Sequence, residues 1–426
     1  MTTYLVTGVS VLGGTPCDLL LRDGRVLDPA DAPRDAVTVD AEGLVALPGL
    51  VDLHTHLREP GREDAETVES GSRAAAAGGF TAVHAMANTE PVADTAGVVE
   101  QVHNLGQTAG YCDVRPVGAV TVGLDGRRLA ELGAMADSAA RVRVFSDDGI
   151  CVSDAVLMRR ALEYVKAFDG VVAQHPQEPR LTEGAQMNEG AMSGVLGLVG
   201  WPAVAEEAMI ARDCLLAGHV GSRLHVCHVS TSGSVELIRW AKSKGWAVTA
   251  EVTPHHLLLT DELVATYDPI YKVNPPLRTS KDVAALRAGL ADGTIDCVAT
   301  DHAPHPTEDK ECEWGAAAMG MLGLETALSV VQHTMVDTGL LDWAAVADRM
   351  SVRPASIGRV FDQGQPLQLG SPANVVLIDP TVVRTIEPME SQSLSRNNPF
   401  RGMELPGRVV ATFLRGRPTV LDGTLL

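Results

Sequence analysis

The sequence is poor in aromatic side chains and contains no closely spaced cysteine pair. Aromatic residues make up 4% of the 426 residues, whereas hydrophobic residues of all kinds make up 45%. We therefore expect a core of small and β-branched side chains, in a chain long enough for a barrel of about 250 residues and an extra module. The seven cysteines are scattered, odd in number and without a CxxC motif. This pattern argues against a disulfide framework and favours a reduced, cytoplasmic setting.

Basic charge is also scarce, because 34 Lys and Arg stand against 54 Asp and Glu, for a net charge of −20. Nucleic acid and anionic membranes need a basic surface, so neither is expected as a partner. An acidic protein that binds an anionic small molecule must build a local cationic site, which makes arginines within motifs informative. The start, MTTYLVTGVSVLGG, lacks a basic region followed by an apolar run. Neither a signal peptide nor a membrane span is expected.

Both ends of the chain carry short strand patterns separated by turns. The first part reads TYLVTGVSV, CDLLLRDGRVLD and AVTVDAEGLVALPG, and its Asp23-Gly24 pair is a hairpin signal. The last part reads ANVVLIDP and RVVATFLRGRPTVLDG. We predict one small β-sandwich domain made from both termini, residues 1–49 and 365–426, around a metal-dependent hydrolase barrel over residues 50–364.

The middle of the chain alternates apolar strand patterns with Ala-rich helical stretches such as DAVLMRRALEYV and AEEAMIARDCLLAGH. Eight strand candidates end in polar residues: LVDLHTH, FTAVHAMAN, VRPVGAVT, RVRVFSDD, GVVAQH, RLHVCHVS, AVTAEVTPHH and IDCVATDHAPH. Eight strand–helix units predict an α/β fold, a closed (β/α)₈ TIM-like barrel. The alternative is an open doubly wound sheet, but no GxGxxG follows a strand.

Histidines gather in these segments, mostly toward the strand ends: ten of the thirteen lie in them. All strand ends of a parallel barrel open on one face, so residues distant in sequence converge there. His54 and His56 are two apart and point the same way along a strand. His175 ends the fifth strand, and Asp301 and His305 lie in the ATDHAPH of the eighth. We interpret these positions as a metal site.

Strand alternation leaves two choices open at this site. The sixth strand offers His225 and His228, which are three apart, so only one can point inward. The fourth strand offers Asp147 and Asp148, and again only one can point inward. Periodicity does not choose within either pair.

Histidines with carboxylates, and no cysteine pattern, suit Zn²⁺ best, although other divalent first-row metals bind such sets. Three or four histidines plus two acids exceed the four positions of one tetrahedral ion. We therefore predict two metal ions bridged by a carboxylate and a hydroxide. Metal binding lowers the pKa of water to about 7, so the hydroxide would be a nucleophile near neutral pH. The extra carboxylate could shuttle a proton.

Several motifs together give the chain a family resemblance. They are HLREPGREDAET, MANTEP, FSDDG, the stretch from MNEG to HVCHVST, EVTPHH, YKVNPPLR, DHAPH and GLETA. With these motifs the chain resembles the dihydroorotases of the amidohydrolase superfamily, most closely the longer bacterial type, class I. The resemblance covers essentially the whole chain. It implies reversible cyclisation of N-carbamoyl-L-aspartate to L-dihydroorotate in pyrimidine (UMP) biosynthesis.

The resemblance also implies roles for individual residues. Two zinc ions per chain, bridged by Asp148 and a hydroxide, would be held by His54, His56, Asp148, His175, His228 and Asp301. Asp301 would in addition act as the catalytic general acid and base. Substrate contacts would come from His56, Arg58, Asn88, Asn274, His305, Met319 and Gly320. Arg58 would offer its planar set of donors to the substrate carboxylate.

Two positions depart from the family pattern. Ala87 stands before Asn88 where the family usually has proline, so the backbone there is less constrained. Gln177 stands two residues after His175 where the family usually has an acid, so the partner that orients this histidine is expected to differ.

Two rival functions share parts of this pattern. One is an allantoinase or hydantoinase, against which Arg58 and the last histidine of DHAPH argue. The other is a non-catalytic homologue that only scaffolds aspartate transcarbamoylase. Such a homologue would be recognised by the loss of metal ligands, and none of the six is missing here. A homodimer and a complex with aspartate transcarbamoylase are the expected assemblies.

Two further expectations concern the barrel mouth. The stretch HPTEDKECEWGAAA, residues 305–318, lacks periodicity, and we interpret it as a loop that closes over substrate. The fourth strand ends in acids with no lysine, so Asp148 is expected to bridge the metals without a carboxylated lysine. Lys166 lies about five helical turns beyond that strand and should be far from the mouth. Ser153 or Asp154 is better placed than Asp148 to cap the intervening helix.

Overall fold

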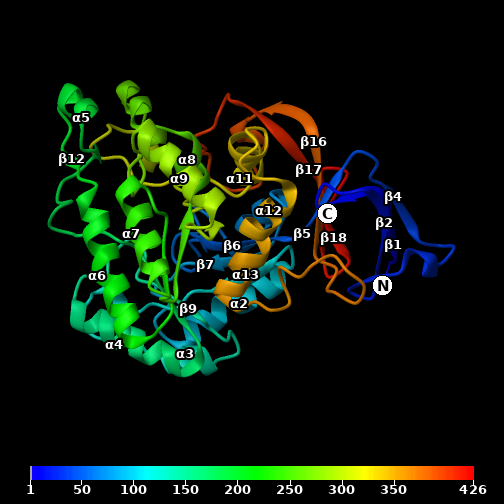
Figure 1. Cartoon of the computed structure of the whole chain (residues 1–426), viewed down its shortest axis with the longest axis horizontal. Coiled ribbons are helices and arrows are strands. Elements are labelled where there is room, and N and C mark those ends of the chain that lie inside the picture. The colour runs from blue at the N-terminus through cyan, green and yellow to red at the C-terminus, as the bar shows by residue number, and fades with distance from the viewer. Residues whose placement is uncertain (1) are drawn as a thin grey trace.

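Eight parallel strands form a barrel in the computed structural model, which describes residues 2–426 (Figure 1). All eight predicted strand segments are present. They are β6 (Leu50–Thr55), β7 (Phe80–Ala85), β8 (Asp113–Pro116), β9 (Val144–Phe145), β10 (Val171–Gln174), β13 (Leu224–Val226), β14 (Val248–Val252) and β15 (Cys297–Val298). Two sheets, β6-β7-β8 and β9-β10-β13-β14-β15, are closed by parallel bridges Gly118–Phe145 and Thr55–His302. The predicted closed barrel is confirmed.

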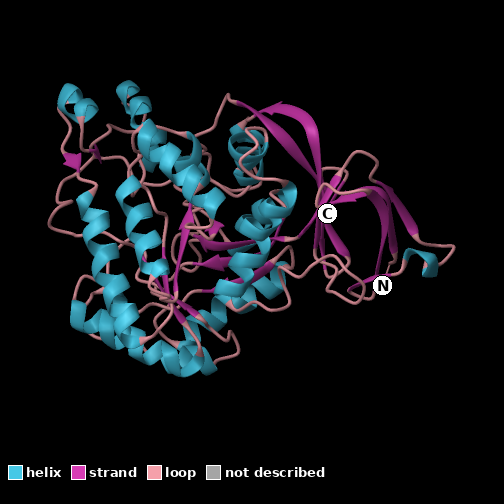
Figure 2. Cartoon of the chain, viewed as in Figure 1, coloured by secondary structure: helices cyan, strands magenta, loops and turns pink. Residues whose placement is uncertain are grey.

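Helices cover the outside of the barrel (Figure 2). The longer ones are α1 (Val68–Ala77), α2 (Ala96–Ala109), α4 (Ala155–Val165), α6 (Val204–Val220), α7 (Ser232–Ser243) and α9 (Ser280–Asp292). Shorter ones are α3 (Leu132–Asp137), α5 (Ala191–Leu196), α8 (Pro254–Leu258), α10 (Thr307–Lys310), α11 (Ala327–Val331), α12 (Trp343–Ala347) and α13 (Arg353–Gly358). A separate pair of short strands is formed by β11 (Met187–Asn188) and β12 (Gly200–Trp201). Helix starts follow local capping chemistry. Asp154, as predicted, accepts from the amides of Val156 and Leu157 at the start of α4.

Both termini build one second domain beside the barrel. Its strands are β1 (Tyr4–Val11), β2 (Pro16–Arg22), β3 (Arg25–Leu27), β4 (Val37–Asp40), β5 (Val45–Pro48), β16 (Val375–Thr385), β17 (Glu404–Leu414), β18 (Arg417–Leu421) and β19 (Thr424–Leu425). The amino-terminal β5 pairs antiparallel with the carboxy-terminal β16. Asp23 and Gly24 turn between β2 and β3 with φ of 51° and 77°. The α/β class with a β-domain from both ends is therefore confirmed.

The link between β16 and β17 leaves the β-domain and returns over the barrel (Figure 1). Ile386 and Phe400 from this link, with Leu405 at the start of β17, pack with barrel residues such as Val273 and Met321 in a buried cluster. The link therefore joins the two domains through an apolar contact at the end of the barrel.

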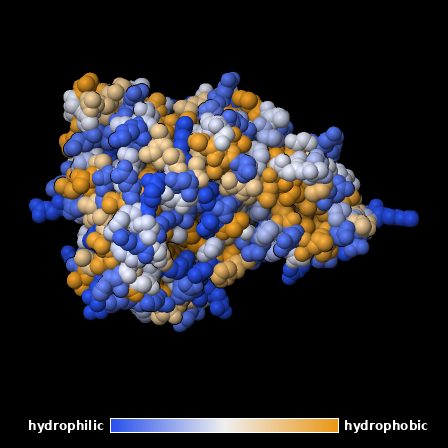
Figure 3. Space-filling view, in the orientation of Figure 1, coloured by the Kyte–Doolittle hydropathy of each residue, from blue (hydrophilic) through white to orange (hydrophobic). Residues whose placement is uncertain are grey.

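Polar and apolar side chains are mixed over the face of the molecule shown in Figure 3. Within residues 2–426, no helix combines the length and apolar character needed to cross a membrane.

Candidate metal centre and active site

The six predicted metal ligands meet at the carboxyl ends of the barrel strands. Each is buried, with at most 6% of its surface exposed: His54, His56, Asp148, His175, His228 and Asp301. They come from or directly follow five different strands, β6, β9, β10, β13 and β15. The convergence follows from a parallel barrel, which opens all its strand ends on one face.

Asp148 lies between two pairs of histidines. Its Oδ1 is 3.2 Å from Nε2 of His54, and its Oδ2 is 3.3 Å from Nε2 of His56. On the other side Oδ1 is 3.4 Å from Nδ1 of His175 and 3.5 Å from Nε2 of His228. Two three-residue groups that could each hold a metal ion therefore share one carboxylate.

Asp301 completes the side of the cluster formed by His54 and His56. Its Oδ1 lies 3.4 Å from Nε2 of His54 and 3.1 Å from Nε2 of His56. Burial favours the neutral acid, but the charge of His54 and the hydrogen bond from His56 outweigh it and lower the pKa of Asp301 to about 2. The group is therefore ionised near neutral pH and has an oxygen that can accept a proton.

The cluster fits a metal better than it fits internal hydrogen bonds. His54 Nε2 and Asp148 Oδ1 are fully buried and have no hydrogen-bond partner within residues 2–426. A tetrahedral zinc ion with ligands at 2.0–2.2 Å places its ligand atoms about 3.3 Å apart, close to the separations between the histidine nitrogens and the two carboxylates. Burying polar atoms without a partner, as at His54 Nε2 and Asp148 Oδ1, costs free energy unless an ion or ligand binds them.

Glu251 on β14 lies next to the cluster and contacts two of its ligand residues. Its Oε1 lies 2.7 Å from Nδ1 of His54 and accepts from the amide of His228 at 3.2 Å. Its Oε2 lies 3.0 Å from Nε2 of His225. Although burial opposes ionisation, the charges and hydrogen bonds of His54 and His225 hold the pKa of Glu251 well below its usual range. A carboxylate that orients a ligand histidine in this way is typical of metal sites.

Two amide side chains orient two other histidines. Asn88 Oδ1 lies 2.9 Å from Nδ1 of His56, so Asn88 reaches the cluster although Ala87 precedes it. Gln177 Oε1 lies 2.8 Å from Nε2 of His175 and also accepts from Asn274 Nδ2 at 3.1 Å. Gln177 thus occupies the position where the family usually has an acidic residue, and its side chain links Asn274 to His175.

The structure also resolves the pairs that strand alternation left open. His225 is turned away from the cluster toward Thr249 and Glu251. Asp147 accepts from the amides of Val120 and Thr121 and from the Thr121 hydroxyl, so it fixes a neighbouring loop. His228 and Asp148 are the members of each pair that face the cluster.

Arg58 places a half-buried positive charge beside the cluster. Its Nε donates to the Pro304 carbonyl at 3.1 Å, and its Nη2 lies 3.4 Å from Nε2 of His305. Within residues 2–426 it forms no ion pair at 4.0 Å or less, because Glu59 and Glu63 accept from backbone amides instead. Burial lowers the pKa of Arg58 to about 10, so it remains charged. A half-buried guanidinium without a carboxylate partner has donors free for an anionic ligand group.

His305, Met319 and Gly320 lie together next to Arg58. His305 Nε2 is 3.0 Å from the Met319 carbonyl. A Cβ at Gly320 would come within 2.7 Å of His305 Nε2, so only glycine permits this approach. Burial, with the charges of Arg58 and Lys310, lowers the pKa of His305 to about 3 and keeps it neutral.

Three residues of the site hold left-handed backbone conformations that non-glycine residues rarely adopt. Their φ angles are 62° at Arg58, 33° at His228 and 47° at Asp301. Such strain persists where the surrounding structure over-determines it, and it concentrates at functional sites.

Residues 305–318 form an irregular segment next to the site that contains only the short α10. Lys310, at the end of α10, is buried and donates to the carbonyls of Lys272, Ala318 and Gly320 at 2.9–3.1 Å. Lys272 in turn donates to the carbonyls of Trp314 and Gly315. Two lysine side chains thus fasten the segment through its backbone.

Lys166 lies away from the cluster, as predicted. It follows the last residue of α4, which ends at Val165, and its Nζ donates to the Val220 carbonyl at 3.0 Å. The carboxylate between the histidine pairs is Asp148 itself.

A closed parallel barrel with a histidine–aspartate cluster at its strand ends defines the amidohydrolase class. A family model described as dihydro-orotase-like matches residues 43–234. Dihydroorotases of Streptomyces coelicolor and Mycobacterium tuberculosis are 69% and 55% identical to this chain, over 100% and 99% of both lengths respectively. The chain belongs to the dihydroorotase family. The structure of an L-hydantoinase (dihydropyrimidinase) from Arthrobacter aurescens matches with a TM-score of 0.88 at 27% identity, covering 100% of this chain and 98% of that one.

Proposed function

We propose that this chain is a zinc-dependent dihydroorotase that interconverts N-carbamoyl-L-aspartate and L-dihydroorotate in UMP biosynthesis. The observation that carries this proposal is the half-buried Arg58, which forms no ion pair within residues 2–426 and lies next to the histidine–aspartate cluster. The cluster suits hydrolysis of a cyclic amide, and the guanidinium suits a substrate with a carboxylate.

Two zinc ions per chain are proposed, since six ligands exceed one tetrahedral site. His54, His56 and Asp301 would hold one ion, His175 and His228 the other, and Asp148 both. Zinc bound there supplies Lewis-acid polarisation of the substrate carbonyl and lowers the pKa of a water molecule.

Asp301 would move the proton of the reaction. In the hydrolytic direction, water adds to the ring amide carbonyl of dihydroorotate and the ring C–N bond breaks. Asp301 takes one proton from the attacking water and returns it to the leaving ring nitrogen, so its charge is restored at the end of the cycle. Its carboxylate lies within the cluster, 3.1 Å from Nε2 of His56 and 3.4 Å from Nε2 of His54, and this position supports the role of proton acceptor.

Substrate binding is assigned to residues around the cationic side of the mouth. Arg58 would bind the substrate carboxylate, with His305 and the backbone of Met319 and Gly320 beside it. His56, Asn88 and Asn274 would contact the substrate from the cluster side. Both amide side chains lie next to ligand histidines or their partner.

The hydantoinase and allantoinase alternative shares the fold and the cluster. Dihydroorotate carries a carboxylate, whereas hydantoin and allantoin do not, so Arg58 favours dihydroorotate. The scaffold alternative is disfavoured because all six ligands converge. A homodimer, a complex with aspartate transcarbamoylase and the cytoplasmic setting stay predictions from the sequence.

One assay tests the proposal. Purified protein is offered dihydroorotate, allantoin and hydantoin, each with and without a chelator. We expect turnover of dihydroorotate alone, abolished by the chelator and restored by zinc. Preference for hydantoin or allantoin, or turnover that survives removal of all metal, would reject the proposed function.

A further inference from the structure

A segment of the carboxy-terminal domain lies against the barrel mouth. Residues 391–398, which we name the strap, belong to the link between β16 and β17. The Ser391 hydroxyl and the Gln392 amide donate to Glu325, and the Ser395 hydroxyl donates to the Ala65 carbonyl at 2.7 Å. These partners belong to the barrel part of the chain, so the strap is fastened across the domain boundary.

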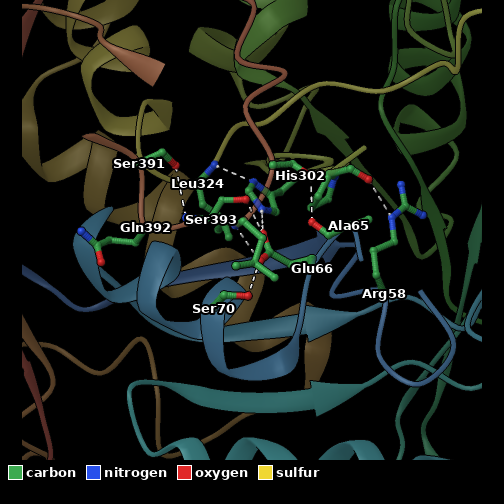
Figure 4. Close-up of polar contacts among 12 residues, drawn as sticks. Arg58, Ala65, Glu66, Ser70, His302, Leu324, Ser391, Gln392 and Ser393 are labelled. Atoms are coloured by element: carbon green, nitrogen blue, oxygen red, sulfur yellow. Dashed lines mark hydrogen bonds and ion pairs between the residues drawn. The ribbon is translucent and has the colours of Figure 1, made fainter. Parts of the chain in front are cut away.

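The middle of the strap binds a fully buried carboxylate. Glu66 accepts from the Ser393 hydroxyl, the Leu394 amide and the Ser70 hydroxyl, and its Oε2 lies 3.4 Å from Nε2 of His302 (Figure 4). His302 directly follows Asp301, and its Nδ1 accepts from the Gly323 amide at 3.2 Å. The strap is therefore anchored to the strand end that carries the proposed acid and base.

Asn397 extends from this anchor into the substrate side of the mouth. It is 3% exposed. Its amide nitrogen donates to the carbonyls of Ala303 at 2.9 Å and Gly320 at 3.2 Å. Its amide oxygen accepts from the backbone N–H of His305 at 3.2 Å. One side chain thus uses both donors and its acceptor to join two backbone segments.

These two segments carry the cationic side of the site. Residues 303–305 supply the carbonyl that holds Arg58 and the imidazole of His305. Residues 319 and 320 supply the carbonyl that faces His305 and the glycine that allows the close approach. A second strap contact, from the Leu322 amide to the Asn397 carbonyl at 3.1 Å, fixes the same region. The spacing of the carboxylate-binding groups therefore depends on Asn397.

We propose that Asn397 is a positioning residue for substrate recognition. It belongs to the strap, outside the barrel, and it sets the distance between two parts of the site. One part is His305 with the neighbouring Arg58, and the other is the backbone at Gly320. This inference rests on the proposed dihydroorotase function. It concerns substrate affinity rather than the metal cluster, because no Asn397 contact within the described chain reaches a metal ligand directly.

The test compares Asn397→Ala with Asn398→Ala in the full-length, zinc-loaded protein. Asn398 is a buried neighbour of the same type, whose side chain accepts only from the Phe400 amide within the link. For Asn397→Ala we expect KM for dihydroorotate and for carbamoyl aspartate to rise about tenfold or more, because buried backbone groups lose their partners. We expect kcat within about threefold of wild type and unchanged zinc content. Hydrogen exchange should also quicken in residues 303–322. Asn398→Ala should change neither KM nor this exchange.

Asn397→Asp separates the donors from the acceptor. It keeps the acceptor for the His305 amide but loses both donors, so it should remain impaired. A wild-type KM in Asn397→Ala, or full recovery of KM in Asn397→Asp, would overturn the inference. Loss of zinc from Asn397→Ala with unchanged hydrogen exchange in residues 303–322 would overturn it as well. Wild-type protein that does not turn over dihydroorotate would instead reject the proposed function, and the exchange comparison would still decide whether Asn397 orders this region.

Discussion

Asp301 is the residue on which the proposed chemistry depends most. In Asp301→Asn the amide could still face His54 and His56 but could not carry a proton. We expect turnover of dihydroorotate to fall by at least about 10²-fold, the usual contribution of general acid–base catalysis, with an intact fold by circular dichroism. Residual activity within about tenfold of wild type would remove Asp301 from the proton-transfer role.

Arg58 is the residue that separates this site from one built for an uncharged ring. Arg58→Met keeps much of the side-chain volume but removes the charge that awaits the substrate carboxylate. We expect KM for dihydroorotate to rise and kcat/KM to fall by a factor that corresponds to about 2–5 kcal/mol, the cost of leaving the bound substrate carboxylate without its charged partner. The control is Arg62→Met, since Arg62 is exposed and pairs with Asp64 and Asp309. Equal kinetics in both variants would make Arg58 structural.

His84 gives the fold a pH dependence of defined sign. Burial, aided by the charge of Arg115, lowers the pKa of His84 to about 4. Below pH 6.5 His84 therefore becomes protonated in the unfolded chain but stays neutral in the folded chain. The free energy of unfolding decreases as the pH falls toward 4. His84→Gln removes this loss. We expect its stability deficit, measured by urea unfolding, to shrink by about 1.4 kcal/mol per pH unit below 6.5. A deficit that stays constant from pH 7.5 to 5 would contradict the assignment.

At the scale of elements, the segment 305–318 is fastened to the mouth chiefly through Lys310. Burial and the charge of Lys272 lower the pKa of Lys310 to about 7, and its ammonium donates to three backbone carbonyls. Lys310→Met should release this segment, and we expect proteolytic nicking within 305–318 to speed up about tenfold, as for a locally opened loop. Lys281→Met, at an exposed lysine, is the control. A nicking rate equal in the two variants would show that Lys310 does not hold the segment.

The proposed lid role of the same segment needs a separate comparison. If residues 305–318 close over substrate, a tight substrate analogue should slow nicking of the wild-type protein there. Equal nicking with and without the analogue would reject the lid while leaving the Lys310 contacts unaffected.

The barrel strands and the flanking strands were predictable because their apolar runs are regular and end in polar residues. The choice between His225 and His228 was not, since β13 ends at Val226 and His228 lies beyond it in a left-handed turn, where strand alternation no longer applies. Glu251 was missed as a support, although a charged residue inside the apolar run of β14 was a usable signal. Family resemblance, rather than periodicity, chose His228 and Asp148.

The strap could not be predicted for a different reason. Its sequence, SQSLSRNN, has no periodicity of a helix or a strand. Its partner Glu66 is more than 300 positions away along the chain, and Asn397 acts on backbone groups that any sequence would provide. Contacts of this kind appear only once the fold has brought the segments together.

At the scale of the whole molecule, two domains share one chain, which passes between them after β5, before β16 and again on both sides of the strap. β5 leads directly into β6 of the barrel and pairs with β16, and the strap returns from the β-domain to the mouth. The division at residues 1–49, 50–364 and 365–426 therefore remains our proposal for the domains, with the strap as a carboxy-terminal contribution to the barrel site.

The central claim is that the barrel holds two zinc ions joined by Asp148, with no modified lysine. The most direct test is to strip the metal and titrate zinc back in CO₂-depleted buffer while following dihydroorotate turnover. We expect activity to rise to a plateau at about two zinc ions per chain without added bicarbonate, because two tetrahedral sites share the six ligands. A plateau at one ion or fewer, a strict bicarbonate requirement, or the mass of one CO₂ added to any lysine would contradict the account.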